Sequence, residues 1–206
     1  FRAEGRTPVV RFRMPDEPVV FEDMVRGEVR FEPENVPDYV LARADGSPLY
    51  PLTNPVDDAV MGITHVLRGE DLLPSTPRQI PLHAVLRSLG VASGPMPRFG
   101  HLPMVLGEGR RRISKRNTPE ASLLQVRAEG FLAEGILNYL ALLGWSPGGD
   151  RELFTLAEMV AAFGVEKINR NPATFDVKKL TAINGVKIRE LEPAEDVLEQ
   201  PGNLHL

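Results

Sequence analysis

The chain has 206 residues, of which 42% are hydrophobic and 25% are charged, a balance that indicates a folded globular protein with one or two domains. Its formal net charge of −4 excludes a protein that coats nucleic acid through overall positive charge, so an anion site must be a local cluster of cations. The chain has no cysteine, which excludes disulfides and thiolate metal ligands, and we expect no zinc site in this stretch. The lack of cysteine fits a reducing compartment, so we expect a cytoplasmic protein. No apolar run approaches the ~20 residues of a membrane-spanning helix, so we expect no membrane partner.

The first 48 residues predict short β-strands. Residues 19–24 and 28–31 have strand-like composition and flank Arg26-Gly27, which predicts a hairpin turn. Residues 39–43 predict another strand, which runs into the turn dipeptide Asp45-Gly46.

From Tyr50 onward the pattern becomes that of an α/β fold. Residues 56–61 predict a short helix that starts near Asn54 or Asp57. The β-branched residues 63–68 predict a strand after it.

The next helix is expected to begin at Ser75 or Thr76, because Pro77 suits the first position of a helix. Thr76 and Gln79 have the spacing of a capping box. Pro81 lies where the ladder of helical hydrogen bonds is already running, so we expect a distorted first turn.

From Thr118-Pro119 the sequence predicts a compact unit of four helices. Thr155 and Glu158 have capping-box spacing before the third of them. Asp176 is placed to cap the last helix, which is expected to end at Gly185.

A cluster of positive charge lies in residues 107–117 of this net negative chain, close to a domain boundary predicted between residues 106 and 117. Such a loop suits a polyphosphate, because lysine provides a point charge and arginine a forked donor. A solvated charged loop, or a patch that contacts RNA phosphates, is an equally good interpretation. The cluster consists of Arg110, Arg111, Arg112, Lys115 and Arg116, with Ser114 among them.

A second candidate site lies at the carboxyl end of strand 63–68, where ligands bind in open α/β sheets. Arg68 can donate paired hydrogen bonds to a carboxylate, and Glu70 can accept them from a hydroxyl or ammonium group. A surface ion pair of Arg68 with Glu70 or Asp71 is the simpler interpretation, and these residues alone favour it.

Several other polar residues could have a functional role, but a common structural role explains each of them as well. Tyr50 and Asn54 can direct their polar groups into one pocket, but a packed tyrosine and an asparagine N-cap are more frequent. Asp57 and Asp58 point about 100° apart on a helix, which favours a helix N-terminus over a metal site. The four histidines lack metal-ligand spacing, and His101, just before the basic loop, either approaches a nucleotide or packs.

Taken in order, several blocks of the chain resemble the bacterial glutamyl-tRNA synthetases, a family of class I aminoacyl-tRNA synthetases. The sequence of these blocks is most similar to that of actinobacterial members. The resemblance covers residues 1 to about 190. The blocks are DYVLARADGSPLY (38–50), NPVDD (54–58), MGITHVLRGED (61–71), TPRQ (76–79), HLP (101–103), ISKR (113–116), NYLALLGW (138–145) and FD (175–176).

The resemblance implies a site for L-glutamate at Tyr50, Asn54 and Arg68. Arg68 would hold the side-chain carboxylate of glutamate. A neutral glutamine amide would leave the guanidinium without its charge partner, so Arg68 favours the glutamyl branch of the family.

The resemblance also implies an ATP site. Lys115 matches the second lysine of the KMSKS loop, which stabilises the charge that develops as pyrophosphate leaves. Arg112 stands where the first lysine usually is, and both are implied to be catalytic. Further ATP contacts are implied for Ser114, Arg116, Glu70, Asp71 and Leu72, with Mg²⁺ arriving on the ATP and no metal site in the protein itself.

By the same resemblance, the chain divides into parts of three domains. The family's HIGH motif and anticodon-binding domain are not found in these residues, so we expect a piece of a longer enzyme. The parts are residues 1–48, the end of an inserted acceptor-stem-binding domain; 49–106, the second half of a Rossmann-type catalytic domain; 107–190, the KMSKS loop with a helical stem-contact domain; and 191–206, an unmatched tail.

These features imply part of a glutamate–tRNA ligase, whose partners are ATP, L-glutamate and tRNA(Glu). The whole enzyme is expected to be monomeric, and the 206 residues alone to be inactive. The alternative is a truncated paralogue that binds tRNA or a protein without aminoacylation. A short homologue that glutamylates a modified tRNA base fits less well, because such proteins lose most of the helical region.

Overall fold

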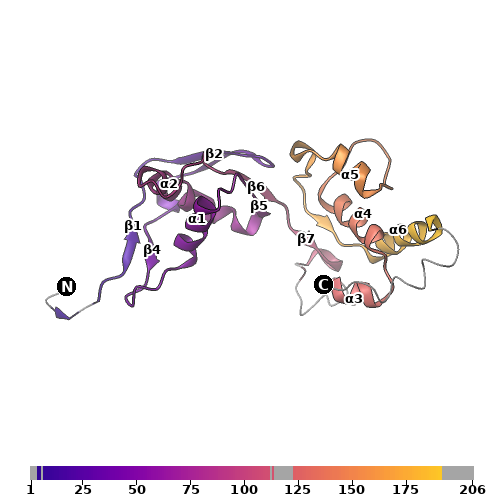
Figure 1. The fold of residues 1–206 in the computed structure, drawn as a ribbon, viewed down its shortest axis with the longest axis horizontal. Coiled ribbons are helices and arrows are strands. Elements are labelled where there is room, and N and C mark those ends of the chain that lie inside the picture. Colours follow the sequence, from indigo (N-terminus) through magenta and orange to yellow (C-terminus); the bar gives the residue numbers. More distant parts are fainter. Residues whose placement is uncertain (1–3, 6, 112, 114–122, 192–206) are drawn as a thin grey trace. The chain divides into compact units, whose positions relative to one another are not determined.

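The computed structural model describes residues 4–5, 7–111, 113 and 123–191 (Figure 1). The chain divides into two compact units, Phe1–Leu102 and Pro103–Leu206, each described below by itself. The combination of sheets and helices confirms the expected mixed α/β class. Within the described ranges, every helix is too short or too polar to cross a membrane.

The first unit contains a four-stranded sheet of order β3-β2-β6-β5, a two-stranded sheet of β1 and β4, and two helices. Its strands are β1 (Val10–Phe12), β2 (Val19–Asp23), β3 (Gly27–Phe31), β4 (Tyr39–Ala42), β5 (His65–Gly69) and β6 (Arg98–Leu102). Its helices are α1 (Tyr50–Val60) and α2 (Thr76–Ser88), with 3₁₀ turns at Pro33–Asn35 and Glu70–Ser75.

The larger sheet brings three strand ends to one edge. Strands β2 and β3 form the expected antiparallel hairpin. Strand β6 runs parallel to both of its neighbours, with Asp23 opposite Phe99 and Arg68 opposite His101. The carboxyl ends of β2, β5 and β6 therefore meet, as parallel strands require.

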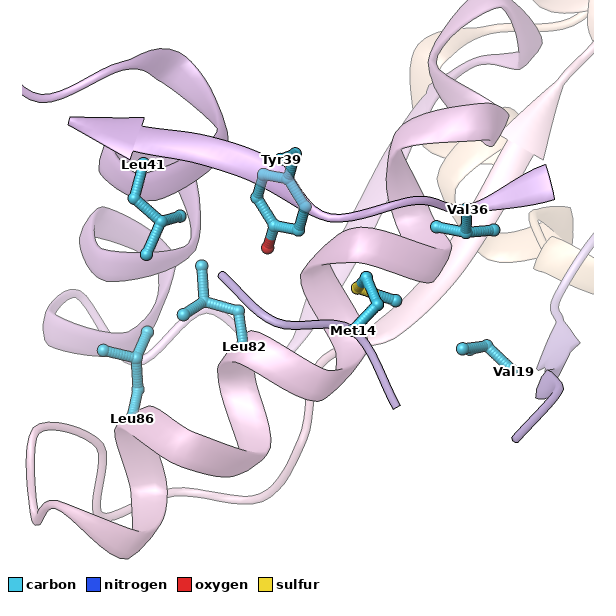
Figure 2. Packing of buried hydrophobic residues seen from close by; sticks show 7 residues of the cluster. All are labelled: Met14, Val19, Val36, Tyr39, Leu41, Leu82 and Leu86. Carbon is cyan, nitrogen blue, oxygen red and sulfur yellow. The ribbon is translucent and has the colours of Figure 1, made fainter. Parts of the chain in front are cut away.

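The hydrophobic core of this unit lies between the small sheet and the two helices. Figure 2 shows Leu82 and Leu86 of α2 pointing toward Tyr39 and Leu41 of β4. The Tyr39 hydroxyl donates to the carbonyl oxygen of Arg78 at 2.9 Å, so this buried phenol is satisfied. Burial raises the pKa of Tyr39 to about 12.

Helix α1 begins six residues before the expected start at Val56, since the structure has it from Tyr50. Leu49 is the extended N-cap residue, and Pro51 costs nothing in the first turn because the N–H groups there have no helical partner. Asn54 therefore lies inside the helix and is not its N-cap, which corrects that expectation.

Helix α2 begins where expected, but the proposed capping box is wrong. Thr76 is itself helical, and its hydroxyl and the Gln79 amide bond to Arg68 instead. The helix also continues through Pro81 as one element.

The second unit is mainly helical. Strands β7 and β8 pair in parallel. The predicted helix start at Thr118-Pro119 lies outside the described residues. The elements are β7 (Val105–Leu106), α3 (Leu123–Ala128), α4 (Ala133–Gly144), α5 (Leu156–Ala162), β8 (Ala173–Thr174) and α6 (Val177–Glu190), with 3₁₀ turns at Glu108–Arg110 and Val165–Lys167.

Two predicted helix starts are confirmed in this unit. Thr155 and Glu158 form a complete capping box at α5, and the Asp176 carboxylate accepts from the first backbone N–H groups of α6. The predicted end of α6 at Gly185 is wrong, since the helix runs on to Glu190. A glycine inside a helix costs about 1 kcal/mol, which tertiary packing readily outweighs.

Helices α4 and α6 pack against each other closely. The buried residues Tyr139, Leu180 and Ile183 form the core between them, and the Tyr139 hydroxyl accepts the N–H of Asp176 at 2.5 Å. A Cβ added at Gly135 would lie 3.2 Å from the Cα and 2.8 Å from the Oδ1 of Asn184. That same Oδ1 accepts the N–H of Leu132 at 2.8 Å, so Asn184 has little freedom to move.

We predict that Gly135→Ala lowers the free energy of unfolding of the second unit by ~1–3 kcal/mol, because the added methyl overpacks the helix contact. Gly144→Ala is the matched control in the same helix, since no atom would lie within 4 Å of its Cβ, and we expect a change within ~0.5 kcal/mol. Urea unfolding followed by the fluorescence of the one tryptophan, Trp145, measures both. Equal stability of the two variants would contradict the close packing.

Candidate functional site

A polar cluster occupies the edge where β2, β5 and β6 end. Its central side chains are Arg68 at the end of β5, His101 at the end of β6 and Asp23 at the end of β2. Thr76 and Gln79, both buried, join it from the first turns of α2. The sheet thus places these groups at the carboxyl ends of its parallel strands, where ligands of α/β proteins bind.

Arg68 is held by hydrogen bonds to several side chains. Its Nε donates to His101 Nε2 at 3.2 Å, and its Nη2 donates to Thr76 Oγ1 at 2.9 Å and to Gln79 Oε1 at 2.7 Å. The guanidinium also lies 5.9 Å from the ring centre of Phe99. These bonds use three of the five N–H donors of arginine, and Tyr50 is a further hydrogen-bond partner of Arg68.

The predicted glutamate-site residues are brought together around Arg68. Gln79 donates from its Nε2 to Asn54 Oδ1 at 2.7 Å, which links Asn54 to Arg68 through one side chain. Burial lowers the pKa of Arg68, and the nearby Tyr50 and Asp58 oppose this effect. The Tyr50 side chain is half exposed at the start of α1.

Asp23 and His101 form a buried pair, with exposed fractions of 1% and 0%. Asp23 Oδ2 lies 2.5 Å from His101 Nδ1, while Oδ1 accepts the N–H groups of Val25, Arg26 and His101. Burial tends to raise the pKa of Asp23, but these hydrogen bonds, led by His101, outweigh it and lower the pKa. The carboxylate is therefore ionised at neutral pH.

His101 is neutral in this setting. Burial lowers its pKa, the hydrogen bond that His101 donates to Asp23 opposes that effect, and the positive charges of Arg68 and Arg26 lower the pKa further. Because Asp23 accepts the proton on Nδ1, the lone pair of the ring is on Nε2 and faces Arg68.

The segment after β5 holds the residues expected near ATP. Glu70, Asp71 and Leu72 lie in the 3₁₀ turn that joins β5 to α2. Glu70 forms an ion pair with Arg26, whereas the hydrogen bonds shown for Arg68 go to neutral groups. The simple Arg68–Glu70 surface pair is therefore not what the structure contains.

The basic loop is described only in part. Arg110 and Arg111 are exposed, and Arg110 adopts a positive φ of 58°. The four expected KMSKS residues, Arg112, Ser114, Lys115 and Arg116, lie outside the described residues.

Asp57 and Asp58 lie near the C-terminal end of α1, so their expected place at a helix N-terminus is wrong. Burial raises the pKa of Asp58, and Asp57 is exposed. In the part of the chain that the structure describes, no three histidine, aspartate or glutamate side chains are grouped so that they could hold a metal ion.

The sequence interpretation missed Asp23, and it assigned Thr76 and Gln79 to helix capping. Nothing near Asp23 in the sequence marks it as part of this site, because its link to Arg68 runs through His101 on another strand. Thr76-Pro77-Arg78-Gln79 is a block that resembles the synthetases, and that resemblance was the available signal for Thr76 and Gln79.

Comparisons with known proteins agree on one family. The model of the tRNA synthetases class I (E and Q), catalytic domain, matches residues 1–182. The glutamate–tRNA ligase of Streptomyces avermitilis is 62% identical over 192 residues, which are 93% of this chain and 38% of the relative. That of Kocuria rhizophila is 59% identical over 195 residues, or 95% and 38%.

A solved structure supports the same conclusion. The glutamate tRNA ligase from Elizabethkingia meningosepticum, in complex with its amino acid, is similar with a TM-score of 0.77 and 31% identity, covering 92% of this chain and 40% of that one. The chain thus spans about two fifths of the length of these relatives. Since the family model matches most of its residues, the chain belongs to the class I tRNA synthetases of the glutamyl and glutaminyl group, within their catalytic domain.

Proposed function

We propose that the chain is part of a cytoplasmic, monomeric glutamate–tRNA ligase, which activates L-glutamate with ATP and transfers it to tRNA(Glu). The observation that carries this proposal is the state of Arg68. His101, Thr76 and Gln79, which occupy its Nε and Nη2 donors, are neutral, and Tyr50 also hydrogen-bonds to it. A half-buried cation held in this way favours an anionic ligand with two acceptor oxygens, such as a carboxylate.

The activation step is an attack by the α-carboxylate oxygen of glutamate on the α-phosphorus of ATP. A mixed anhydride forms and pyrophosphate leaves. A hydroxyl of the tRNA then attacks the glutamyl carbonyl carbon, and AMP leaves. These steps depend on positioning and on charges placed where negative charge develops.

Arg68 sets the choice of amino acid in this proposal, with Tyr50 and Asn54 beside it. A glutamate side chain offers a carboxylate to the Nη1 donors, whereas glutamine offers an amide that carries no charge. The guanidinium would then be desolvated without compensation, which disfavours glutamine.

The ATP site in this proposal rests on the resemblance of the basic loop. Lys115 and Arg112 would stabilise the leaving pyrophosphate, with Ser114 and Arg116 beside them. The turn Glu70–Ser75 would approach the nucleoside, and Mg²⁺ would arrive with the ATP as part of the substrate. Residues 1–48 and 107–190 are proposed to contact the acceptor stem and the inner side of the tRNA.

In the full-length protein that carries this chain, we expect Arg68→Gln to raise the KM for glutamate by about 10- to 150-fold, the loss expected for a hydrogen bond to a charged group. Arg87→Gln is the control, because Arg87 is an exposed arginine on α2. Aminoacylation kinetics with varied glutamate measure both variants. An unchanged KM for Arg68→Gln would remove Arg68 from the glutamate site.

We expect Lys115→Ala to lower the kcat of glutamate activation by about 10²-fold or more, with the KM for glutamate nearly unchanged, because its charge acts mainly in the transition state. Rapid quenching of the activation step measures this. A large change in KM with normal kcat would contradict the assigned role. Binding of tRNA by the full-length protein without any aminoacylation would instead support the truncated binding module.

A further inference from the structure

The buried Asp23–His101 pair has no part in the function proposed above, yet it leads directly to Arg68. The two carboxylate oxygens of Asp23 have different partners. Asp23 Oδ1 accepts three backbone N–H groups, which secures the turn after β2 and the end of β6. Asp23 Oδ2 contacts only the imidazole among the bonds shown, and the imidazole contacts Arg68.

We propose that Asp23 and His101 are positioning residues for Arg68: Asp23 fixes the tautomer of His101, whose Nε2 then orients the guanidinium toward the carboxylate ligand. The identity of that ligand as glutamate rests on the function proposed above. The orientation itself does not, because it follows from contacts within the protein.

The tautomer is determined from both ends of the ring. Arg68 Nε carries a hydrogen and cannot accept one, so the His101 Nε2 that lies 3.2 Å away must be the acceptor. The ionised Asp23 carboxylate can only accept, so Nδ1 must carry the ring proton. The opposite tautomer would place N–H against N–H at Arg68 and a lone pair against the carboxylate.

Thr76 closes the arrangement on the other side. Its hydroxyl accepts from Arg68 Nη2 at 2.9 Å and lies 3.0 Å from His101 Nε2, to which it can donate. His101, Thr76 and Gln79 together engage every donor on Nε and Nη2. The donors that these three residues leave are those on Nη1, so a rotated guanidinium would present a different edge to the ligand.

The variant Asp23→Asn separates the backbone contacts of Oδ1 from the contact of Oδ2 with His101. The asparagine oxygen can keep the backbone bonds of Oδ1, while its amide nitrogen offers a proton to Nδ1 and so favours the Nε2–H tautomer. Asp16→Asn is the matched control, since it removes the same charge from an exposed position just before β2.

The first test is ¹⁵N NMR of the histidine rings in the 206-residue chain. We expect His101 to be a neutral Nδ1–H ring in the unaltered chain and in Asp16→Asn, and to become the Nε2–H tautomer in Asp23→Asn. An Nε2–H ring in the unaltered chain, or no change in Asp23→Asn, overturns the proposal. This test needs no substrate, so it stands whether or not the proposed function is correct.

The second test uses a pair of His101 variants in the full-length protein, and it does not depend on Asp23→Asn folding. His101→Gln can place an amide oxygen near the position of Nε2, whereas His101→Asn keeps a donor for Asp23 and leaves nothing for Arg68. We expect His101→Asn and Asp23→Asn to raise the KM for glutamate at least fivefold, with kcat within about threefold. His101→Gln should restore most of the loss. Equal KM values for the two His101 variants, with both proteins folded by circular dichroism, overturn the proposal.

The pH profile gives a readout that a packing role would not move. On acidification His101 gains a proton at Nε2, the atom that faces Arg68; Arg26 is also nearby, and Asp23 bonds to the other ring nitrogen. The protonated ring can no longer accept from Arg68, so the KM for glutamate should rise. Because burial lowers the pKa of His101, the rise should begin below the ordinary histidine value of about 6.5. His101→Gln should lack it, and the same rise in that variant overturns the proposal. An unaltered protein that does not aminoacylate at all would refute the proposed function and leave the NMR result standing.

Discussion

The buried carboxylate of Asp23 is the interaction on which the candidate site depends. A charge with 1% exposure is stable only if its oxygens are fully hydrogen-bonded, and Asp23 meets this condition with partners from β6 and from the turn after β2. Two strands that share only a short parallel contact are thereby joined at their ends. The site lies at this joint.

A chain of polar contacts runs from that carboxylate to the edge of the sheet. It passes through a neutral imidazole to Arg68, and then through Gln79 to Asn54 in α1. Each side chain in this chain of contacts hydrogen-bonds to the next. The acceptors that hold the Nε and Nη2 groups of Arg68 are neutral. Preorganisation of this kind leaves little rearrangement for ligand binding itself.

The second unit is stabilised by different means. Its helix ends are secured locally by Thr155, Glu158 and Asp176, while the contact between α4 and α6 requires Gly135 on one helix and Asn184 on the other. Asn138 adds a buried polar link, donating to the carbonyl oxygen of Glu152 at 2.7 Å and accepting the N–H of Phe154 at 2.8 Å.

The sequence by itself determined the α/β class, the hairpin of β2 and β3, and the caps of α5 and α6, because these depend on periodicity and on residues close in the chain. Resemblance of whole blocks identified the family and drew attention to Arg68. Tertiary structure alone decided the partners of Arg68 and the role of Asp23, which lies 78 positions before His101. It also showed that Asn54, Thr76 and Gln79 belong to the polar cluster and do not cap helices. The reason is that the sheet brings Arg68 beside these side chains, and they hydrogen-bond in its network.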